Sequence, residues 1–260
     1  MPLTVNTQLL AAGVRLLKIY LRRGIMKRNN GYYFFMTITY LCLLLLFVCS
    51  NNQAEAAEKE TPVLPEILPS QIIFVAGEGV TAKLSMYTQQ PNGCWIKNLA
   101  AEGFIGRNGL GKTKEGDGKT PTGIFPLQQA FGIERNPGTI KNYTRVNRHH
   151  YWVDDLNSQY YNQLVRDDHV KKDWKSAEHL ANYKIQYAFS LVIGYNAECV
   201  KGVGSGIFLH CSANKPTAGC VAVPQNTMIS ILKELKQDCI ISIGSPKQIA
   251  AQIDVLPLDK

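Results

Sequence analysis

The segment Gly204–Val223 reads GSGIFLHCSANKPTAGCVAV, and it holds the two side chains with the clearest catalytic potential in the chain. The apolar run Ile207–Leu209 predicts a buried strand. His210 follows at the end of that run, where the backbone would hold its imidazole rigidly. A polar loop through Pro216 turns the chain back, and two small residues then lead to Cys220. The segment therefore predicts a histidine and a thiol brought together by one strand and the loop after it.

A thiol attacks a carbonyl when a base removes its proton and when hydrogen-bond donors hold the resulting oxyanion. Here Cys220 can be the nucleophile and His210 the base and then the acid. The backbone amides of Gly219 and Cys220 are the candidate oxyanion donors. In the alternative interpretation the cysteine is a small buried hydrophobe and the histidine an ordinary core group. The residues alone leave both interpretations open.

Cys211 adjoins His210, so a metal site is a further alternative. Structural zinc takes four ligands, usually as two closely spaced pairs. The sequence contains no C-x-x-C and no H-x-x-x-H. We therefore expect no metal, and nothing in the sequence indicates another cofactor.

The segment resembles the active-site signature of the YkuD-type L,D-transpeptidases, in which a histidine precedes an S/T-x-G-C nucleophile motif. Other stretches carry the same resemblance in the right order, over roughly residues 72 to 243. Glu115–Phe125 is similar to the family's GKTPTGxF segment. Trp152–Asp155, followed by Ser158 and Tyr161–Asn162, resembles the WVDD…S…YN run of one branch, and Ser176–Glu178 matches that branch as well.

Two features depart from the commonest form of the family. The gap between His210 and Cys220 is shorter, and Ala222 stands where an arginine usually follows the cysteine by two residues. That arginine is thought to help hold the site or a substrate carboxylate, so recognition of the donor is left open. Both departures fit the divergent branch.

The resemblance implies a mainly β fold with packed helices, in a single YkuD-like β-sandwich catalytic domain. It implies an L,D-transpeptidase that acts on peptidoglycan stem peptides through a Cys220 thioester, with His210 oriented by a backbone carbonyl. We expect Thr217, Glu178 and Asp155 to lie behind the reacting residues.

Other activities remain as alternatives. With water as acceptor, the enzyme would be an L,D-carboxypeptidase. A non-catalytic wall-binding domain is possible if Cys220 is disulfide-bonded, for instance to Cys211. A papain-like peptidase is disfavoured, because there the cysteine precedes the histidine by more than about a hundred residues.

The order of signals along the chain predicts mostly strands and two helices. The expected strands are Ile72–Ala76, Lys83–Tyr87, Trp95–Ala100, Ile185–Gly194, Ile207–Cys211 and Ile240–Ile243, with a shorter one around Val153. Apolar residues at helical spacing predict helices at Asp168–Tyr183 and Gln225–Lys236. Because the second helix begins soon after Cys220, we expect its positive end and a protonated His210 to favour the thiolate.

The front of the chain has the pattern of a leader rather than of a fold. Lys27–Arg28 precede an apolar run, Tyr32–Cys49, and Ala54–Ala56 resembles a cleavage signal. We therefore expect residues 1–56 to be a signal peptide, or a membrane anchor if it is uncleaved, with Met26 as the true start. A Pro-rich tether at 57–70 and a catalytic domain at 71–260 would follow, outside the cytoplasm in the cell wall or periplasm.

The net charge of +8 comes largely from the expected leader. The remainder has 22 basic and 19 acidic residues, and no basic stripe with interleaved aromatic residues. We therefore expect no nucleic-acid partner, no membrane contact beyond the leader, and a monomer.

Five cysteines remain after the expected leader is removed, namely Cys94, Cys199, Cys211, Cys220 and Cys239. An odd number in an exported protein indicates at least one free thiol, and the sequence does not assign any pairing.

Gly106–Thr113 matches the G-x-x-x-x-G-K-T string of nucleotide-binding loops. Such a loop works only where a helix begins directly after it. Here Glu115–Gly118 and Pro121 follow, and these residues cannot begin a helix. The match therefore predicts an ordinary loop and no ATP.

Overall fold

A computed structural model describes residues 64–65 and 68–259, which belong to one compact unit, Thr61–Lys260. The expected leader at 1–56 and most of the expected tether at 57–70 lie outside the described residues. In the described part of the chain, no helix is long and apolar enough to span a membrane.

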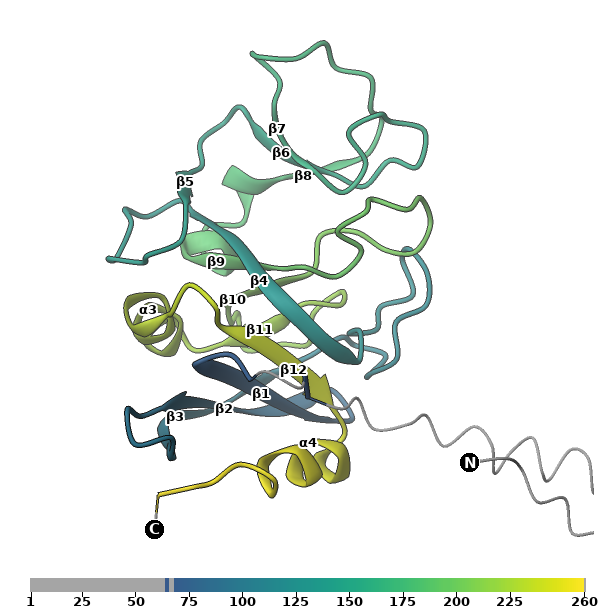
Figure 1. The fold of residues 1–260 in the computed structure, drawn as a ribbon. Helices are drawn as coiled ribbons and strands as arrows, with labels where there is room; N and C mark the ends of the chain where they lie inside the picture. Colours follow the sequence, from purple (N-terminus) through teal and green to yellow (C-terminus); the bar gives the residue numbers. More distant parts are fainter. Residues whose placement is uncertain (1–63, 66–67, 260) are drawn as a thin grey trace, which may run out of the picture. The chain divides into compact units, whose positions relative to one another are not determined.

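Nine strands form the main sheet, in the order β12-β1-β2-β3-β11-β10-β9-β4-β5 (Figure 1). They are β1 (Gln71–Glu78), β2 (Thr81–Gln89), β3 (Trp95–Phe104), β4 (Gly123–Gly132), β5 (Tyr143–Arg145), β9 (Ser190–Ile193), β10 (Phe208–Cys211), β11 (Val221–Val223) and β12 (Ile240–Gly244). Strand β12 pairs with β1 in parallel and with β4 antiparallel. The sheet therefore closes on itself around an interior, which removes most exposed strand edges.

A second sheet of three strands, which we call the cap sheet, has the order β7-β6-β8. Its strands are β6 (His150–Val153), β7 (Leu164–Arg166) and β8 (Ala177–His179). The helical elements are η1 (Leu180–Asn182), η2 (Gln186–Ala188), α3 (Gln225–Glu234) and α4 (Pro246–Ile253). Figure 1 shows the cap sheet at one end of the ribbon, beyond β9 and β4, and α4 at the other.

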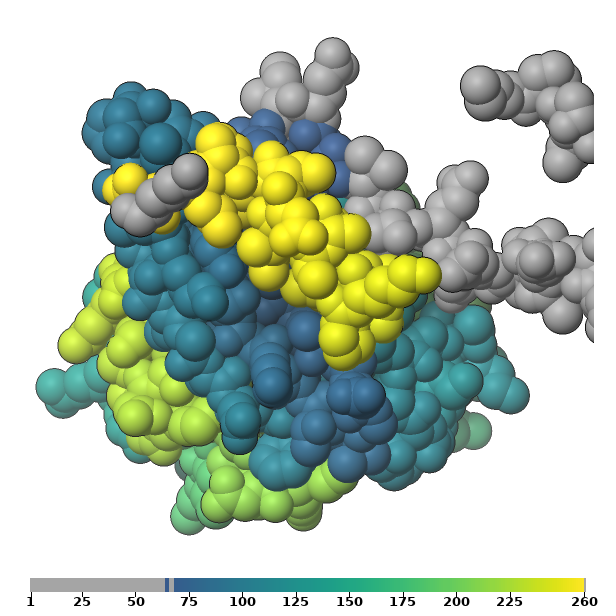
Figure 2. Space-filling model, turned by 90° about the horizontal axis from the view of Figure 1, so that it is seen from below, coloured from purple at the N-terminus to yellow at the C-terminus, as the bar shows by residue number. Residues whose placement is uncertain are grey.

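Strand β1 is apolar at successive positions because both of its faces are covered. Ile73 and Val75 point into the closed sheet. Ile72 and Phe74 point outward, where they pack with Ile249 of α4. Figure 2 shows this C-terminal segment lying across the outer surface of the first strands.

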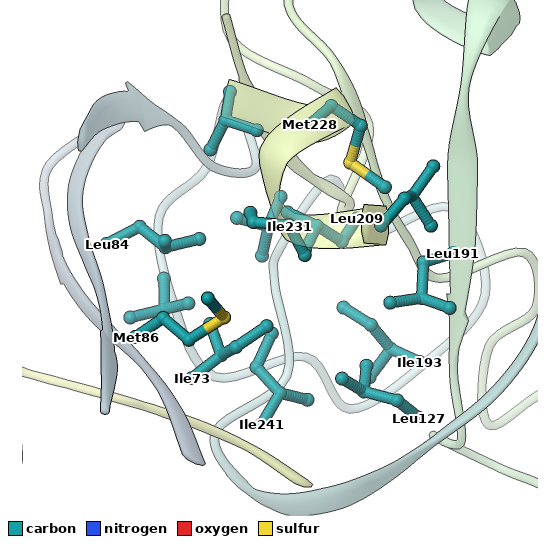
Figure 3. Packing of buried hydrophobic residues seen from close by; sticks show 14 of the residues in the cluster. Ile73, Leu84, Met86, Leu127, Leu191, Ile193, Leu209, Met228, Ile231 and Ile241 are labelled. Carbon is teal, nitrogen blue, oxygen red and sulfur yellow. The ribbon is translucent and has the colours of Figure 1, made fainter. Parts of the chain in front are cut away.

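The interior of the closed sheet is filled by aliphatic side chains from nearly every strand, and α3 supplies the rest. Met228, Ile231 and Leu232 of α3 are fully buried there. Figure 3 shows Met228 and Ile231 in the same cluster as Leu209 and Leu84. Because α3 is tied to the interior, it braces β10 and β11 from the side opposite to the site described below.

Most of the expected elements are confirmed. The predicted strands at Ile72–Ala76, Lys83–Tyr87, Trp95–Ala100, Ile207–Cys211 and Ile240–Ile243 correspond to β1, β2, β3, β10 and β12. Val153 lies in β6, and the helix expected from Gln225 is α3. The mainly β fold class is confirmed as well.

The helix expected at Asp168–Tyr183 is wrong. That stretch contains the short strand β8 and the single turn η1. Its apolar residues pack into two separate clusters. Trp174 packs with Val153 and Val165, whereas Leu180 belongs to the cluster that contains Tyr187 and Phe208. Tertiary packing has therefore overridden the helical spacing.

The strand expected at Ile185–Gly194 begins late. Its first part is η2, and only Ser190–Ile193 is extended. Helix α4 was not predicted, although Ser245 and Gln248 form a capping box with Pro246 at the first helical position. That combination is a helix-start signal that the sequence does contain.

Candidate active site

His210 and Cys220 share one face of two neighbouring parallel strands. The ladder joins Leu209 to Val221 and His210 to Ala222, which places Cys220 beside Phe208. Side chains alternate along a strand, so His210 and Cys220 project from the outer face while Leu209 and Val221 project into the interior. The two residues are diagonal neighbours on that outer face, as the sequence predicts.

A backbone carbonyl fixes the ring of His210. Its Nδ1 lies 2.8 Å from the carbonyl oxygen of Cys211. Because a carbonyl oxygen can only accept, Nδ1 carries the proton and Nε2 keeps a free lone pair. Tyr187 of η2 packs edge-on against the ring, with centroids 5.7 Å apart and an interplanar angle of 89°. The imidazole is thus held as a base whose reactive nitrogen is Nε2.

The thiol of Cys220 is held by two backbone groups. Its Sγ accepts from the N–H of Phe208 at 3.3 Å and donates to the carbonyl oxygen of Gly206 at 3.2 Å. Cys220 is 8% exposed and His210 is 6% exposed. Both reactive groups therefore lie almost entirely out of water.

Burial decides the protonation of both groups. It raises the pKa of Cys220 to about 12, and the negative charge of Glu178 adds to this increase. The hydrogen bond from the N–H of Phe208 and the positive charge of Lys112 act in the opposite direction and lower it. Burial also lowers the pKa of His210 to about 4, although the bond to Cys211 works against this. The free site therefore holds a neutral thiol beside a neutral imidazole.

This state corrects the expectation of a thiolate favoured by a protonated His210 and by a helix end. Strand β11 and then Pro224 separate Cys220 from α3. Four residues of extended chain span roughly 13 Å. The positive end of α3 therefore lies at the far end of β11, beyond the range at which a helix terminus acts.

The motif around Trp152 and Asn162 holds the loop in front of the thiol. The Asn162 side-chain oxygen accepts from the indole N–H of Trp152 and from the N–H of Gly206, both at 3.0 Å. The Tyr161 hydroxyl donates to Glu115 at 2.6 Å and accepts from the N–H of Gly204. Residues far apart in sequence thus converge on the glycine loop whose Gly206 carbonyl accepts the hydrogen bond from the Cys220 thiol.

Thr217 closes the loop directly before the nucleophile. Its hydroxyl donates to the carbonyl oxygen of Cys220 at 2.7 Å and accepts from the N–H of Gly219 at 3.1 Å. The N–H of Gly219, one of the two expected oxyanion donors, is therefore engaged by Thr217 in this structure. The Cys220 amide donates to no side chain of the described residues, so it is the freer of the two donors.

Glu178 reaches the site from the cap sheet. It accepts a short hydrogen bond from the hydroxyl of Tyr187, the residue that packs on His210. Burial raises the pKa of Glu178 to about 6, with further increases from the carboxylates of Asp154 and Glu115, against a decrease from Tyr187. Glu178 thus lies behind Tyr187, and its carboxyl keeps its proton to a higher pH than an ordinary glutamate does.

The raised pKa of Glu178 has a measurable consequence for stability. The folded chain binds this proton more tightly than the unfolded chain does, so stability is fully present below the ordinary pKa of 4.5 and is lost as pH rises through about 6. The loss corresponds to about 2 kcal/mol. We expect Glu178→Gln to remove this loss, which denaturant unfolding at pH 4.5 and 7 would measure.

Asp155→Asn is the matched control for that experiment. Hydrogen bonds from the backbone of Lys175 and Asn157 lower the pKa of Asp155. Asp155 is therefore ionised throughout this pH range, and its replacement should leave the pH dependence unchanged. An identical pH dependence in the wild type and in Glu178→Gln would contradict the burial of the Glu178 carboxyl.

Asp155 does not lie behind the reacting residues, which corrects that expectation. Its carboxylate accepts from the N–H of Lys175 at 2.6 Å and from that of Asn157 at 2.9 Å. It therefore closes the long loop of the cap sheet. The neighbouring Asp154 acts on Glu178 through its charge, as Glu115 does.

The five cysteines in the described part of the chain are free thiols. Cys211 follows His210 on β10, so its side chain points into the interior, where its Sγ donates to the carbonyl of Phe189. It lies on the opposite face of the sheet from Cys220. A disulfide between the two is therefore excluded by direction.

Among the described residues, one group brings three possible metal ligands within 4.8 Å of one another, namely His149, Asp167 and Asp168. Asp168 is paired with Arg166 at 2.7 Å, and His149 with Asp167 at 2.8 Å. This group lies in the turns that adjoin β6 and β7 of the cap sheet, and it contains neither His210 nor Cys220. No residue of the candidate active site takes part in it.

The sequence interpretation missed Tyr187, Thr120 and Lys112. Tyr187 fell within an expected strand, and no local signal marks its contact with His210. The Thr120 hydroxyl lies 3.4 Å from the carbonyl oxygen of Cys220, and it accepts from Gly106. Lys112 lies within the Gly106–Thr113 string that predicts an ordinary loop, and Thr120 follows seven residues after that string.

The geometry places a histidine and a cysteine next to each other on the outer face of a closed β-sheet. The family model for the YkuD L,D-transpeptidase catalytic domain matches residues 101–243. The chain belongs to this family, whose members are cell-wall enzymes.

Among solved structures, the chain is similar to the helical cell shape determining protein Pgp2 from Campylobacter jejuni. The identity is 14% and the TM-score 0.39, with 74% of this chain and 53% of that chain covered. A mutant of the same protein gives 17% identity and a TM-score of 0.37, with 77% and 57% covered. The chain thus spans little more than half the length of Pgp2. No curated protein matches the sequence.

Proposed function

We propose that this protein is an exported cysteine L,D-transpeptidase that acts on peptidoglycan stem peptides through a thioester on Cys220. Membership of the family supports a cell-wall enzyme. One observation carries the specific proposal. His210 and Cys220 project from the same face of paired strands, and the proton on Nδ1 leaves Nε2 of His210 free to act as a base.

The buried neutral pair sets the order of the first steps. When a donor peptide enters, Sγ turns from the carbonyl oxygen of Gly206 toward Nε2 of His210 and gives up its proton as it attacks the donor carbonyl. Hydrogen bonds of this kind are often long before substrate binds. The developing oxyanion accepts from the Cys220 amide, and from that of Gly219 once its bond to Thr217 opens.

The later steps return His210 to its neutral form twice. His210 protonates the departing amine, the carbon–nitrogen bond breaks, and the terminal D-alanine leaves a thioester on Cys220. A side-chain amine of a second stem then attacks the thioester and gives a proton to Nε2, the carbon–sulfur bond breaks, and Nε2 passes that proton to the departing sulfur, which restores the thiol and the neutral imidazole. With water in place of that amine, the same site would act as an L,D-carboxypeptidase.

Tyr187 and Glu178 support the base in this scheme. The ring of Tyr187 keeps His210 from turning, while its hydroxyl is held by Glu178. A negative Glu178 near Cys220 disfavours the thiolate, which agrees with a thiol that ionises only during attack. We propose no metal or other cofactor.

Incubating the purified full-length chain with tetrapeptide stems tests the proposal. We expect release of the terminal D-alanine and new cross-linked muropeptides, both followed by mass spectrometry. Hydrolysed stems without cross-links would instead favour the carboxypeptidase. Intact stems after long incubation, with Cys220 still reactive, would contradict both activities and leave a wall-binding role.

The position of the chain in the cell is part of the proposal. We propose that residues 1–56 export the protein, or anchor it if they remain uncleaved, and that 57–70 hold the catalytic domain at 71–260 away from the membrane. The domain would act there as a monomer. Fractionation of cells and N-terminal sequencing of the mature protein test this part.

A further inference from the structure

Lys112 carries a buried positive charge next to the nucleophile segment. Its side chain is 2% exposed, and its Nζ lies 3.0 Å from a carboxylate oxygen of Asp117, whose side chain is 7% exposed. Asp117 also accepts from the N–H groups of Thr113, Lys114 and Lys119. A buried ion pair needs such additional hydrogen bonds to hold together. The loop therefore holds this ion pair in one defined arrangement.

The side chain of Lys112 fills the space between the two glycine segments that flank Cys220. A Cβ atom placed on Gly204 would lie 2.3 Å from Cε of Lys112, and one placed on Gly219 would lie 3.7 Å from Nζ. Gly204 belongs to the loop whose Gly206 carbonyl accepts a hydrogen bond from the Cys220 thiol. The ammonium group thus lies beside Gly219, the residue that directly precedes Cys220 in the sequence.

Four groups face the thiol from the elements around it. They are His210 from β10, Tyr187 from η2, Glu178 from β8 and Lys112 from the loop before β4. Ala222, the next residue on the same face of β11, carries no charge. Of the charges acting on Cys220, that of Glu178 opposes the thiolate and that of Lys112 favours it.

The negative carboxylate of Asp117 partly offsets the positive charge of the Lys112 ammonium group. Other polar groups around the pair are Glu115, Tyr161 and Tyr195, and Tyr195 also borders Gly204. The hydrogen bonds to Asp117 hold its pKa well below the ordinary value. Asp117 therefore stays negative at every pH at which the enzyme would work, and the pair keeps a constant orientation beside Gly219.

We propose that the Lys112–Asp117 pair is an electrostatic positioning device for the nucleophile, in which the Lys112 ammonium stabilises the negative charge that develops at Cys220. The proposal rests on Cys220 as the nucleophile of the proposed function. Lys112 does not touch the reacting atoms in this arrangement, and it acts through the field at Cys220 and through its packing against Gly219.

The sign of the charge separates this role from a merely structural one. In the full-length chain, Lys112→Met removes the positive charge with little change in shape, and Asp117→Asn removes the negative charge. We expect Lys112→Met to slow alkylation of Cys220 by iodoacetamide about tenfold at a fixed pH. This factor corresponds to a rise of about one unit in the pKa of the Cys220 thiol. We expect Asp117→Asn to speed it by a similar factor, and the double variant to lie between them.

The measurement is the rate of Cys220 alkylation from pH 7 to 10, followed on its peptide by mass spectrometry at a temperature well below melting. If the pair is only structural, both single variants loosen the loop and change the rate in the same direction. That result, or no change in either variant, would overturn the proposal.

Alkylation uses no peptidoglycan, so the outcome is independent of the proposed function. Rate changes of opposite sign in a chain that never processes stem peptides would support the positioning role and reject only the transpeptidase. Normal turnover of stem peptides, together with alkylation rates that change in the same direction in both single variants, would support the transpeptidase and reject the positioning role.

Discussion

Replacing Cys220 by alanine is expected to abolish release of the terminal D-alanine and formation of the acyl-enzyme, with a loss of roughly 10³-fold or more. The substitution removes the proposed nucleophile, which shares the outer face of the paired strands with His210. It deletes a single sulfur atom and leaves the backbone and its neighbours in place, so the melting temperature should change little. Intact-protein mass spectrometry after mixing with a tetrapeptide stem would detect the thioester directly.

Cys211→Ala is the matched control for that variant. It makes the same substitution nine residues earlier in the chain, at a thiol that points into the interior and is 0% exposed. The Cys211 carbonyl that holds His210 is retained because it belongs to the backbone. We expect turnover to persist in Cys211→Ala. Turnover that persists in Cys220→Ala would refute the proposed mechanism.

Gly219→Val is expected to lower turnover by about 100-fold or more while the thiol remains in place. The φ angle of Gly219 is +152°, a conformation that favours glycine. A Cβ there would lie 2.9 Å from the carbonyl oxygen of Lys119 and 3.2 Å from Ile207. The peptide between Gly219 and Cys220 must therefore shift, and loss of one preorganised oxyanion donor typically has an effect of this size.

Lys215→Ala tests the exposed side of the same loop. Lys215 is exposed, so we expect its replacement to change turnover by less than about threefold, as surface substitutions have small effects. Steady-state kinetics on one stem peptide would compare the two variants. Comparable losses in both would indicate that the loop acts through its charge on the substrate rather than through the geometry of the oxyanion donors.

Local patterns predicted those strands and helices whose apolar residues pack into the closed sheet or one cluster beside it. The apolar runs at Ile72–Ala76 and Ile240–Ile243 became paired strands because both are buried on the closed sheet. The spacing of Met228, Ile231 and Leu232 predicted α3, since this helix buries one face in one core. These signals required no knowledge of distant residues.

The same reasoning failed where one segment serves two clusters. Trp174 and Leu180 have helical spacing, yet they pack into different clusters on either side of β8. Side chains from elsewhere also hold this segment, since Asp155 accepts from the backbone of Lys175. A pattern within one window cannot report such contacts, because they depend on how the cap sheet is placed over the main sheet.

The sequence by itself determined the mainly β fold, the family, and the pairing of His210 with Cys220, because strand alternation and the motif spacing are local properties of the chain. The tertiary structure decided the electrostatics of the site. It buried both reactive groups, so that the thiol is neutral rather than activated, and it brought Glu178, Tyr187 and Lys112 around them. A pKa depends on which charges and how much water surround a group, and only the folded chain sets that environment.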